Sequence, residues 1–465
     1  MQRTMFRWGV LGALAGLAAG MAPAQTVSGR ETAATASRAV PGMQAPVPGA
    51  LPIPMEQGTE LARLVEAAWA LQPEALAAGA RARAGAARRE IAGQWTAEPP
   101  AVSLSAKTDR FNGREGAREY EAGIALPLWL PGERAHTARL ADAEEGAEQG
   151  RLAAARLRTA GQVREAWWQW LRAEAVLAQA QERLTSAEAL AADVARRVRA
   201  GDLALVDRHQ ADGAMASAQA GVAEAEGALE GVRLALGALV ATEDLRPAPA
   251  AQARRREGVP EPVPTASEAV AAVDAHPELI ALRRKAEVAR RAAELASVQE
   301  RANPELALLT TRDRGARGEA YRQSATVALR IPFGGGSRHE ARVASALAEA
   351  MEAEAQLERE QARVRAQAAA ARARHSAAQA QWEAAQKREA LAAATRGFVQ
   401  KSFALGETDL PTRLRIEQEA ADAARDAVRA RLDRDAAVSG LRQALGLLPP
   451  GSPLDTAAAP EAPPR

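Results

Sequence analysis

The pattern of apolar and polar positions along this chain switches from a helical period to alternation and back, and it does so twice. After each switch a proline-free helical stretch follows, at about 134–200 and 338–405, and each would reach roughly 100 Å as a helix. Both stretches end at a glycine, Gly201 or Gly406, which permits a sharp turn. A second helical run follows each turn, at about 205–240 and 414–445. The sequence therefore predicts two long helical hairpins, each with a tight tip.

The alternating segments lie directly before the long helices. In the first of them Val102 and Leu104 alternate with serines, and Tyr120, Ala122 and Ile124 recur at every second position after a polar turn. This pattern predicts β-hairpins with one apolar face, with strands at about 101–109 and 119–129 and, in the second half, at about 305–312 and 320–332. Such lengths are typical of outer-membrane barrel strands, but soluble hairpins alternate in the same way, so the hairpins alone do not decide.

The two halves of the chain repeat each other at a nearly constant offset. Three matched pairs differ by 204 positions and two by 205: Pro73 with Pro277, Pro100 with Pro304, Arg134 with Arg338, Pro127 with Pro332, and Gly201 with Gly406. A constant offset across helix breakers, strands and tips indicates an internal repeat. Each half is expected to contain a helix, two strands, a long helix and a return helix.

The repeat and the composition divide the chain into segments. Arg3 and Arg7, an apolar run at 8–21 and an Ala-Pro-Ala site predict a secretory signal peptide; a single membrane anchor is the alternative, for which the run is short. The predicted segments are the signal peptide 1–24, a flexible segment 25–55, the first repeat 56–245, a proline-rich linker 246–265, the second repeat 266–448 and a flexible tail 449–465.

Composition narrows the range of functions. The chain has no cysteine, which excludes disulfides, thiolate metal sites and a lipid-modified cysteine. A formal net charge of +2 does not favour nucleic acid as a partner. Four strands cannot close a barrel, since about eight is the practical minimum. Three chains would supply twelve strands, so the sequence predicts a homotrimer.

Several local motifs, in the same order in both halves, resemble the TolC-like outer-membrane efflux family, most closely its CzcC-like heavy-metal branch. They are His276-Pro277-Glu278-Leu279, Asn303-Pro304, the Leu-Pro-Leu-Trp-Leu-Pro-Gly-Glu-Arg run at 126–134, and the tips at 199–203 and 405–409. The resemblance implies a mostly α fold with a small β-barrel contribution. Four strands per chain would form a shared trimeric barrel in the outer membrane, continued by an α-helical tunnel into the periplasm.

The resemblance also implies where the functional residues lie. The adaptor-docking tips would be Gly201, Asp202, Leu203, Gly406, Glu407 and Thr408, and the pore or gate candidates would be Asp207, Asp409, Phe403 and Arg415. For the acidic residues, capping of the return helices is the structural alternative. Phe403 stands where a tyrosine can hydrogen-bond in related gates, and Thr412 and Arg415 stand where carboxylates can line the pore. The gate of this chain is therefore expected to be held in a different way.

No enzyme motif was found. The five histidines do not pair at ligand spacing, the glycine run at 334–336 lacks the lysine of a phosphate loop, and no Ser-His-Asp pattern is present. We therefore expect no catalysis, no cofactor and no resident metal. The predicted function is a passive exit duct for heavy-metal cations. It would work with a periplasmic adaptor and an inner-membrane pump of the RND type, surrounded by outer-membrane lipid. The alternatives are a duct for drugs or small organic toxins, and a periplasmic coiled-coil adaptor or scaffold without a pore.

Overall fold

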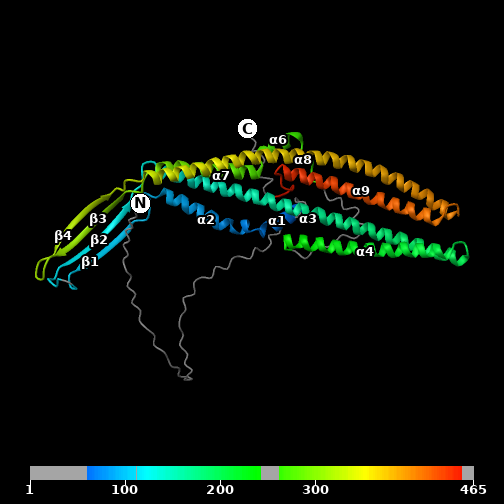
Figure 1. Cartoon of the computed structure of the whole chain (residues 1–465), viewed down its shortest axis with the longest axis horizontal. Helices are drawn as coiled ribbons and strands as arrows, with labels where there is room; N and C mark the ends of the chain where they lie inside the picture. Colours follow the sequence, from blue (N-terminus) through cyan, green and yellow to red (C-terminus); the bar gives the residue numbers. More distant parts are fainter. Residues whose placement is uncertain (1–59, 112, 242–260, 453–465) are drawn as a thin grey trace, which may run out of the picture. The chain divides into compact units, whose positions relative to one another are not determined.

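The computed structural model describes residues 60–111, 113–241 and 261–452 (Figure 1). The predicted signal peptide, the segment 25–55, the linker residues 246–260 and the tail from 453 onward lie outside the described residues. The described residues all belong to one compact unit, Met55–Arg465.

The described residues are mostly helical, with four strands, and the same element order occurs twice, as the sequence predicts. The first repeat comprises α1 (Glu60–Ala70), α2 (Pro73–Gly93), β1 (Ala101–Thr108), β2 (Arg118–Pro127), α3 (Glu133–Ala200) and α4 (Leu205–Val240). The second comprises α6 (Ala266–Asp274), α7 (Pro277–Val298), β3 (Glu305–Arg314), β4 (Arg322–Arg330), α8 (Gly336–Ala404) and α9 (Leu410–Ala444). The long helices α3 and α8 have 68 and 69 residues.

The four strands form one antiparallel sheet in the order β1-β2-β3-β4. Its register aligns the apolar positions of all four strands on one face, as in the row Val102, Ile124, Leu308 and Val327. The side chains of this face are exposed, Val102 and Val327 to 72% each. Strands β1 and β4 have a neighbour on one side only, so each leaves an unpaired edge in the described chain.

The main hydrophobic core lies partway along α3, on the side that meets α1, α4 and α9. Trp167, Trp168 and Trp170 of α3 are at most 6% exposed, and the rings of Trp167 and Trp170 meet edge to face at 5.2 Å. They pack with Leu61 and Val65 of α1 and with apolar residues of α4 and α9. Elsewhere the contacts along the long helices are made mainly by alanines, whose small side chains let backbones approach closely. No helix in the described ranges combines the length and the hydropathy needed to cross a membrane.

A buried ion cluster joins the two repeats beside this core. Glu261 is 4% exposed, and its carboxylate accepts hydrogen bonds from Arg164 of α3, 3.1 Å from Nε to Oε2, and from Ser439 of α9. Nε of Arg442 lies 3.3 Å from Oε1 of the same carboxylate. Removing one partner of such a cluster would leave a buried charge uncompensated. Glu261 therefore fixes the residues that precede α6 against both repeats.

The turn after α9 packs tightly against the start of α7. Gly446 has a φ of 75°, and a Cβ at this position would lie 2.6 Å from Pro277 Cδ and 2.8 Å from His276 Cδ2. His276 is the N-cap of α7 and its Nδ1 accepts a hydrogen bond from the Glu278 N–H at 3.3 Å. The repeat motif at 276–279 is thus held by the glycine that ends the second repeat.

We predict that Gly446→Ala strongly destabilises the fold. The new Cβ would clash with the rigid Pro277 ring, and alanine is strained at positive φ, so the loss should exceed about 1 kcal/mol. The measurement is the thermal unfolding midpoint of the protein in detergent. Gly440→Ala is the matched control, because nothing lies within 4 Å of a Cβ there and alanine favours the helix interior. An equal decrease for both variants would contradict the prediction.

We also predict that His276 makes stability depend on pH. Burial lowers the pKa of His276 below its usual value of 6.5, and Arg363 adds to this effect while Glu360 opposes it. The unfolded chain therefore binds the proton more readily, so this contribution to stability is present above pH 6.5 and is lost as the pH falls toward the folded-state pKa. Unfolding midpoints should fall over this range. His276→Asn keeps an N-cap residue without titrating and should flatten the profile; an unchanged slope would contradict the assignment.

Candidate functional site

At the tip of the first hairpin, α3 ends at a glycine and α4 begins with a capping hydrogen bond. Gly201 adopts a φ of 87°, and the N–H of Asp202 donates to the Arg197 carbonyl at 3.0 Å, which closes the last turn of α3. The N–H of Ala204 donates to Asp207 Oδ2 at 3.0 Å, so the Asp207 carboxylate satisfies a free donor at the start of α4.

The second tip has the same design with a different cap. Gly406 has a φ of 80°, and the N–H of Glu407 donates to the Ser402 carbonyl at 3.0 Å. Asp409 is the N-cap of α9 and its Oδ1 accepts from the Thr412 N–H at 3.1 Å. The hydrogen bonds from the side chain and backbone of Thr412 lower the pKa of Asp409 below its usual value. The exposed side chains of Asp202 and Glu407 show no hydrogen bond among the described residues, so the capping carboxylates are Asp207 and Asp409.

Phe403 is buried between two arginines where the hairpins meet. Its ring is 2% exposed, with the guanidinium carbon of Arg197 (α3) 4.9 Å and that of Arg413 (α9) 4.6 Å from the ring centroid. Arg197 also donates to the Phe403 carbonyl at 3.3 Å and pairs with Asp193 at 3.3 Å. Cation–π contacts strengthen when the cation is desolvated. The first hairpin is thus fastened to the second through α3, α8 and α9.

The partly buried side chain of Arg413 lacks one of the hydrogen bonds that a guanidinium group usually makes. Its Nε is buried and has no hydrogen-bond partner within the described residues. Burial lowers the pKa of Arg413 from its usual value, and nearby Arg197 acts in the same direction, while Glu417 and Asp193 oppose the shift. The Phe403 ring is therefore an important partner of this cation.

The other predicted site residues occupy two kinds of position. Leu203 is half-buried and packs with Phe403, Leu410 and their neighbours in the small hydrophobic cluster that joins the tips. Thr408 exchanges a hydrogen bond with Ser402, 2.6 Å between the hydroxyl oxygens. Arg415 is exposed and pairs with Glu419 of the next turn at 2.6 Å. The tips thus bring Leu203 and Phe403 together, whereas Arg415 takes no part in this cluster.

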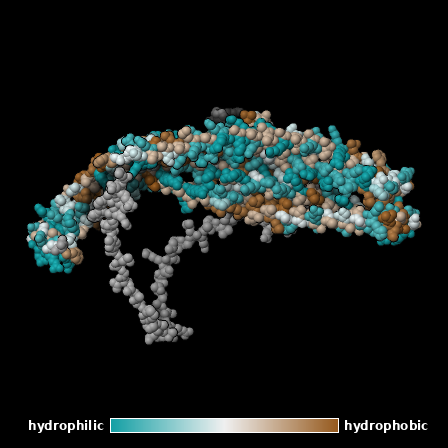
Figure 2. Space-filling model, viewed as in Figure 1, coloured by the Kyte–Doolittle hydropathy of each residue, from teal (hydrophilic) through white to brown (hydrophobic). Residues whose placement is uncertain are grey.

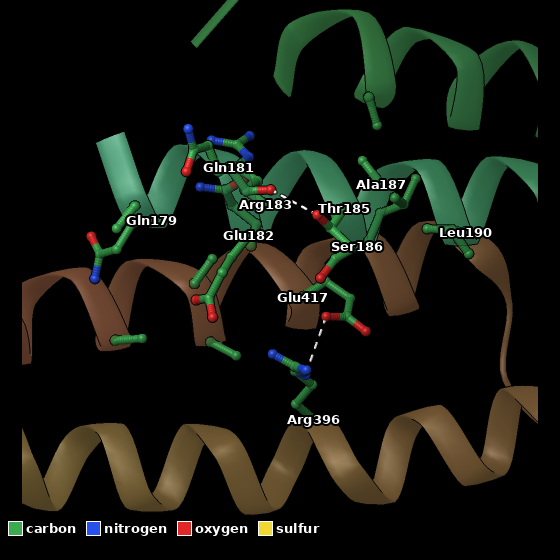
Figure 3. A pocket seen from close by; sticks show the side chains of 17 residues that line it. Gln179, Gln181, Glu182, Arg183, Thr185, Ser186, Ala187, Leu190, Arg396 and Glu417 are labelled. Carbon is green, nitrogen blue, oxygen red and sulfur yellow. Dashed lines mark hydrogen bonds and ion pairs between the residues drawn. The ribbon is translucent and has the colours of Figure 1, made fainter. Parts of the chain in front are cut away.

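A groove of about 1020 Å³ lies between α3 and α9, on the side of this cluster away from the tips (Figure 3). Figure 3 shows Gln179, Glu182 and Ser186 of α3 lining it above Glu417 of α9. Glu417 pairs with Arg396 of α8 at 3.3 Å and accepts a hydrogen bond from Gln400 at 2.6 Å. The groove is lined by polar and apolar side chains in similar measure, and its carboxylate Glu417 is held by α8.

Sequence reasoning identified the tips and Phe403 but not the two arginines that enclose the ring. Arg197 was recognisable only as the fourth residue after Asp193, a spacing that predicts a surface ion pair. Arg413 comes from the other side of the second tip. No sequence pattern relates Arg197 to Arg413, because they belong to different repeats.

Comparison with known proteins gives a family match over part of the chain, and a fold. The family model of outer membrane efflux proteins matches residues 65–242, which cover most of the first repeat. No curated protein sequence matches the chain significantly. The described structure is nevertheless similar to several solved channels.

Three of these solved structures illustrate the similarity. The outer membrane protein VceC of Vibrio cholerae is 20% identical with a TM-score of 0.64, over 83% of this chain and 96% of that one. CusC is 15% identical with a TM-score of 0.67, over 83% and 92%. The outer membrane channel MtrE of Neisseria gonorrhoeae, solved in its open state, is 18% identical with a TM-score of 0.66, over 84% and 90%. At these identities the likeness establishes the fold, which this chain shares with proteins solved as outer membrane channels.

We predict that Phe403→Leu loosens the tips. Leucine keeps an apolar side chain in the cluster but provides no ring for either guanidinium, so amide hydrogen exchange at Gly406 and Glu407 should accelerate by roughly fivefold. Phe398→Leu is the matched control on the same helix, since Phe398 is 71% exposed. Equal exchange rates in the two variants would show that the stacked arginines do not hold the tips.

Proposed function

We propose that this chain, a TolC-like outer membrane efflux protein by its family match and its fold, is the exit channel of a tripartite efflux system. It would lie in the cell outer membrane and extend into the periplasm. There it would receive cargo through a periplasmic adaptor from an inner-membrane pump of the RND type. The chain would act as a passive duct, with the pump supplying the energy.

The unpaired edges of the sheet carry this proposal. Strands β1 and β4 each leave a row of backbone donors and acceptors without partners in one chain, and such edges cannot remain open in a bilayer. Three copies joined edge to edge would close a sheet of twelve strands, above the practical minimum of about eight. The exposed apolar face with Val102 and Val327 would then meet lipid, and the serine-rich face would line the pore.

The helical hairpins would continue the duct, with the tips as docking sites. Asp202 and Glu407 are exposed and do not cap a helix. Apolar side chains are exposed beside them, Val206 to 58% and Leu405 to 75%. Figure 2 shows hydrophobic residues on the surface where the hairpins end. Exposed apolar residues next to charges mark interaction surfaces, and we assign this one to the adaptor. The docking turns would be 201–203 and 406–408.

Heavy-metal cations are the cargo that we propose, on the resemblance of the exit and tip motifs to the CzcC-like branch. In a trimer Asp202 and Glu407 would each recur three times around the entrance, and rings of carboxylates favour cations. A duct for drugs or small organic toxins is the competing function, and it predicts no cation preference. A scaffold without a pore would explain the hairpins but not the amphipathic sheet.

The test combines the mass of the purified protein in detergent with its conductance in a planar bilayer. A trimer with a small, cation-selective and mostly closed conductance is expected. Because the carboxylates would attract cations, Asp202→Asn with Glu407→Gln should lower the selectivity without abolishing the current.

Glu224→Gln is the matched control, an exposed carboxylate remote from the tips along α4. A conducting trimer without cation preference would support the alternative cargo. A soluble, non-conducting monomer would refute the channel and favour the scaffold.

A further inference from the structure

Both tyrosines of the chain lie together at the end of the sheet away from the helices. The rings of Tyr120 and Tyr321 are 6.3 Å apart. The guanidinium carbons of Arg312 and Arg314 lie 4.8 and 5.0 Å from the centroid of Tyr321, and Arg118 contacts the side chains of both tyrosines. We call these five residues the Arg–Tyr cluster. Figure 2 shows hydrophilic residues gathered at this end of the strands.

The Arg–Tyr cluster belongs to the apolar face of the sheet. In the β2–β3 register Arg118 pairs with Arg314 and Tyr120 with Arg312, and further along the same face Ile124 pairs with Leu308. Side chains alternate between faces with a period of two, so the arginines and the lipid-facing residues share one surface. Arg118, Arg312 and Arg314 come from the central strands β2 and β3, and Tyr321 directly precedes β4, so all five residues of the cluster belong to one chain.

The neighbouring carboxylates Glu119, Asp313, Asp109 and Glu319 bind partners other than the clustered arginines. Glu119 and Asp313 lie on the opposite face, where they pair with Lys107 at 3.5 Å and with Arg322 at 3.6 Å. In the loops, the Asp109 carboxylate accepts the Gly116 N–H at 2.8 Å, and that of Glu319 accepts backbone N–H groups of residues 315 and 316.

Among the described residues, no carboxylate lies within 4 Å of the guanidinium nitrogens of the three clustered arginines. Arg314 donates from Nε to the Gly116 carbonyl at 3.2 Å, which orients its side chain without neutralising it. Three guanidinium groups thus stand on the lipid-facing surface without a counter-ion from this sheet. A site of this charge and donor density fits an anion.

The position of the cluster matches one interface of a membrane. From Tyr321 to Ile331 the chain advances ten residues, roughly 33 Å along a strand. A tilt of 35–45° converts this into about 25 Å, the height of the apolar band of outer-membrane barrels. The strands leave the helices at the end near Ile331, so the cluster lies at the far side of the band. If the helices are periplasmic, as the proposed function has it, the cluster faces the headgroups of the outer leaflet.

We propose that the Arg–Tyr cluster binds the phosphate groups of outer-leaflet glycolipids. The planar guanidinium fork matches phosphate oxygens in bidentate geometry, and the tyrosine rings fix the arginines while they occupy the interface, as aromatic girdles do. The acyl chains of the lipid would lie along the apolar face below, on Ile124 and Leu308. The inference rests on the proposed outer-membrane location, but it assigns this surface a specific ligand.

The test measures lipid retention by the full-length protein in detergent, using native mass spectrometry. The probes are bisphosphorylated lipid A and its fully dephosphorylated form. The wild-type protein should retain the phosphorylated lipid preferentially. Arg118→Gln, Arg312→Gln and Arg314→Gln together should weaken its retention by roughly tenfold or more, because three charge-assisted contacts are lost.

The matched control is the triple variant Lys107→Gln, Arg322→Gln and Arg330→Gln, which removes equal charge from the opposite face and should leave retention unchanged. Equal retention of the two lipids, or equal loss in both triple variants, would overturn the proposal. Complete displacement of the lipid by inorganic pyrophosphate at equal concentration would also overturn it, because the site would then recognise free anions rather than the leaflet.

Planar-bilayer conductance separates this inference from the proposed function. A wild-type protein that conducts but retains both lipids equally would refute the lipid site and leave the channel intact. A wild-type protein that neither inserts nor conducts would refute the channel, and with it the membrane location on which the site depends.

Discussion

Close packing along two helices of 68 and 69 residues is the constraint on which the rest of the structure depends. A helix of roughly 100 Å cannot bury itself in a globular core, so it needs partners along its whole length. Helix α3 finds them in α2, α7 and α4, and α8 finds them in α7 and α9. The internal repeat follows from this need, because each copy supplies one long helix and the shorter helices that cover it.

Each alanine contact along the hairpins buries little apolar surface. The few large buried side chains are concentrated in two places, partway along α3 and at the tips. Partway along α3, Trp167, Trp168 and Trp170 anchor α1, α4 and α9, and the buried Glu261 ties both repeats together with Arg164 and Arg442. At the tips, the ring of Phe403 holds Arg197 and Arg413. Between these two contact regions lies the groove of α3 and α9. The large side chains thus hold the helices together at two levels, partway along α3 and at the tips.

The two faces of the sheet carry different kinds of side chain. On the polar face, two ion pairs lie near the same end of the sheet, Lys107 with Glu119 and Arg322 with Asp313. On the apolar face the cationic side chains are confined to one end and are held by tyrosine rings. This separation has a physical cause, because a charge within the apolar band is costly whereas an arginine at its rim can reach headgroups. The same separation gives the proposed channel a surface that can recognise the leaflet around it.

The sequence by itself determined the repeat, the four strands, the two hairpins and the position of the tips. These features depend on local rules: the period of the apolar pattern, the prolines that end helices and the glycines that allow positive φ. One helix boundary was misplaced, because α9 begins at Leu410 rather than near 414. Asp409 caps it, and Pro411 is tolerated in a first turn where its missing N–H costs nothing. The assignment of the tip residues to docking and gating remains a proposal.

Only the tertiary structure decided which distant side chains meet. The contact of Phe403 with Arg197 and Arg413, the bonds of Glu261 to Arg164 and Arg442, and the pairing of β2 with β3 all join residues of different repeats or widely separated segments. Sequence periodicity places a side chain on a face of its own element, but it carries no information on the register between elements. That register is set by packing over the whole length of the helices, and it creates the stacked arginines at the tips and the Arg–Tyr cluster on the sheet.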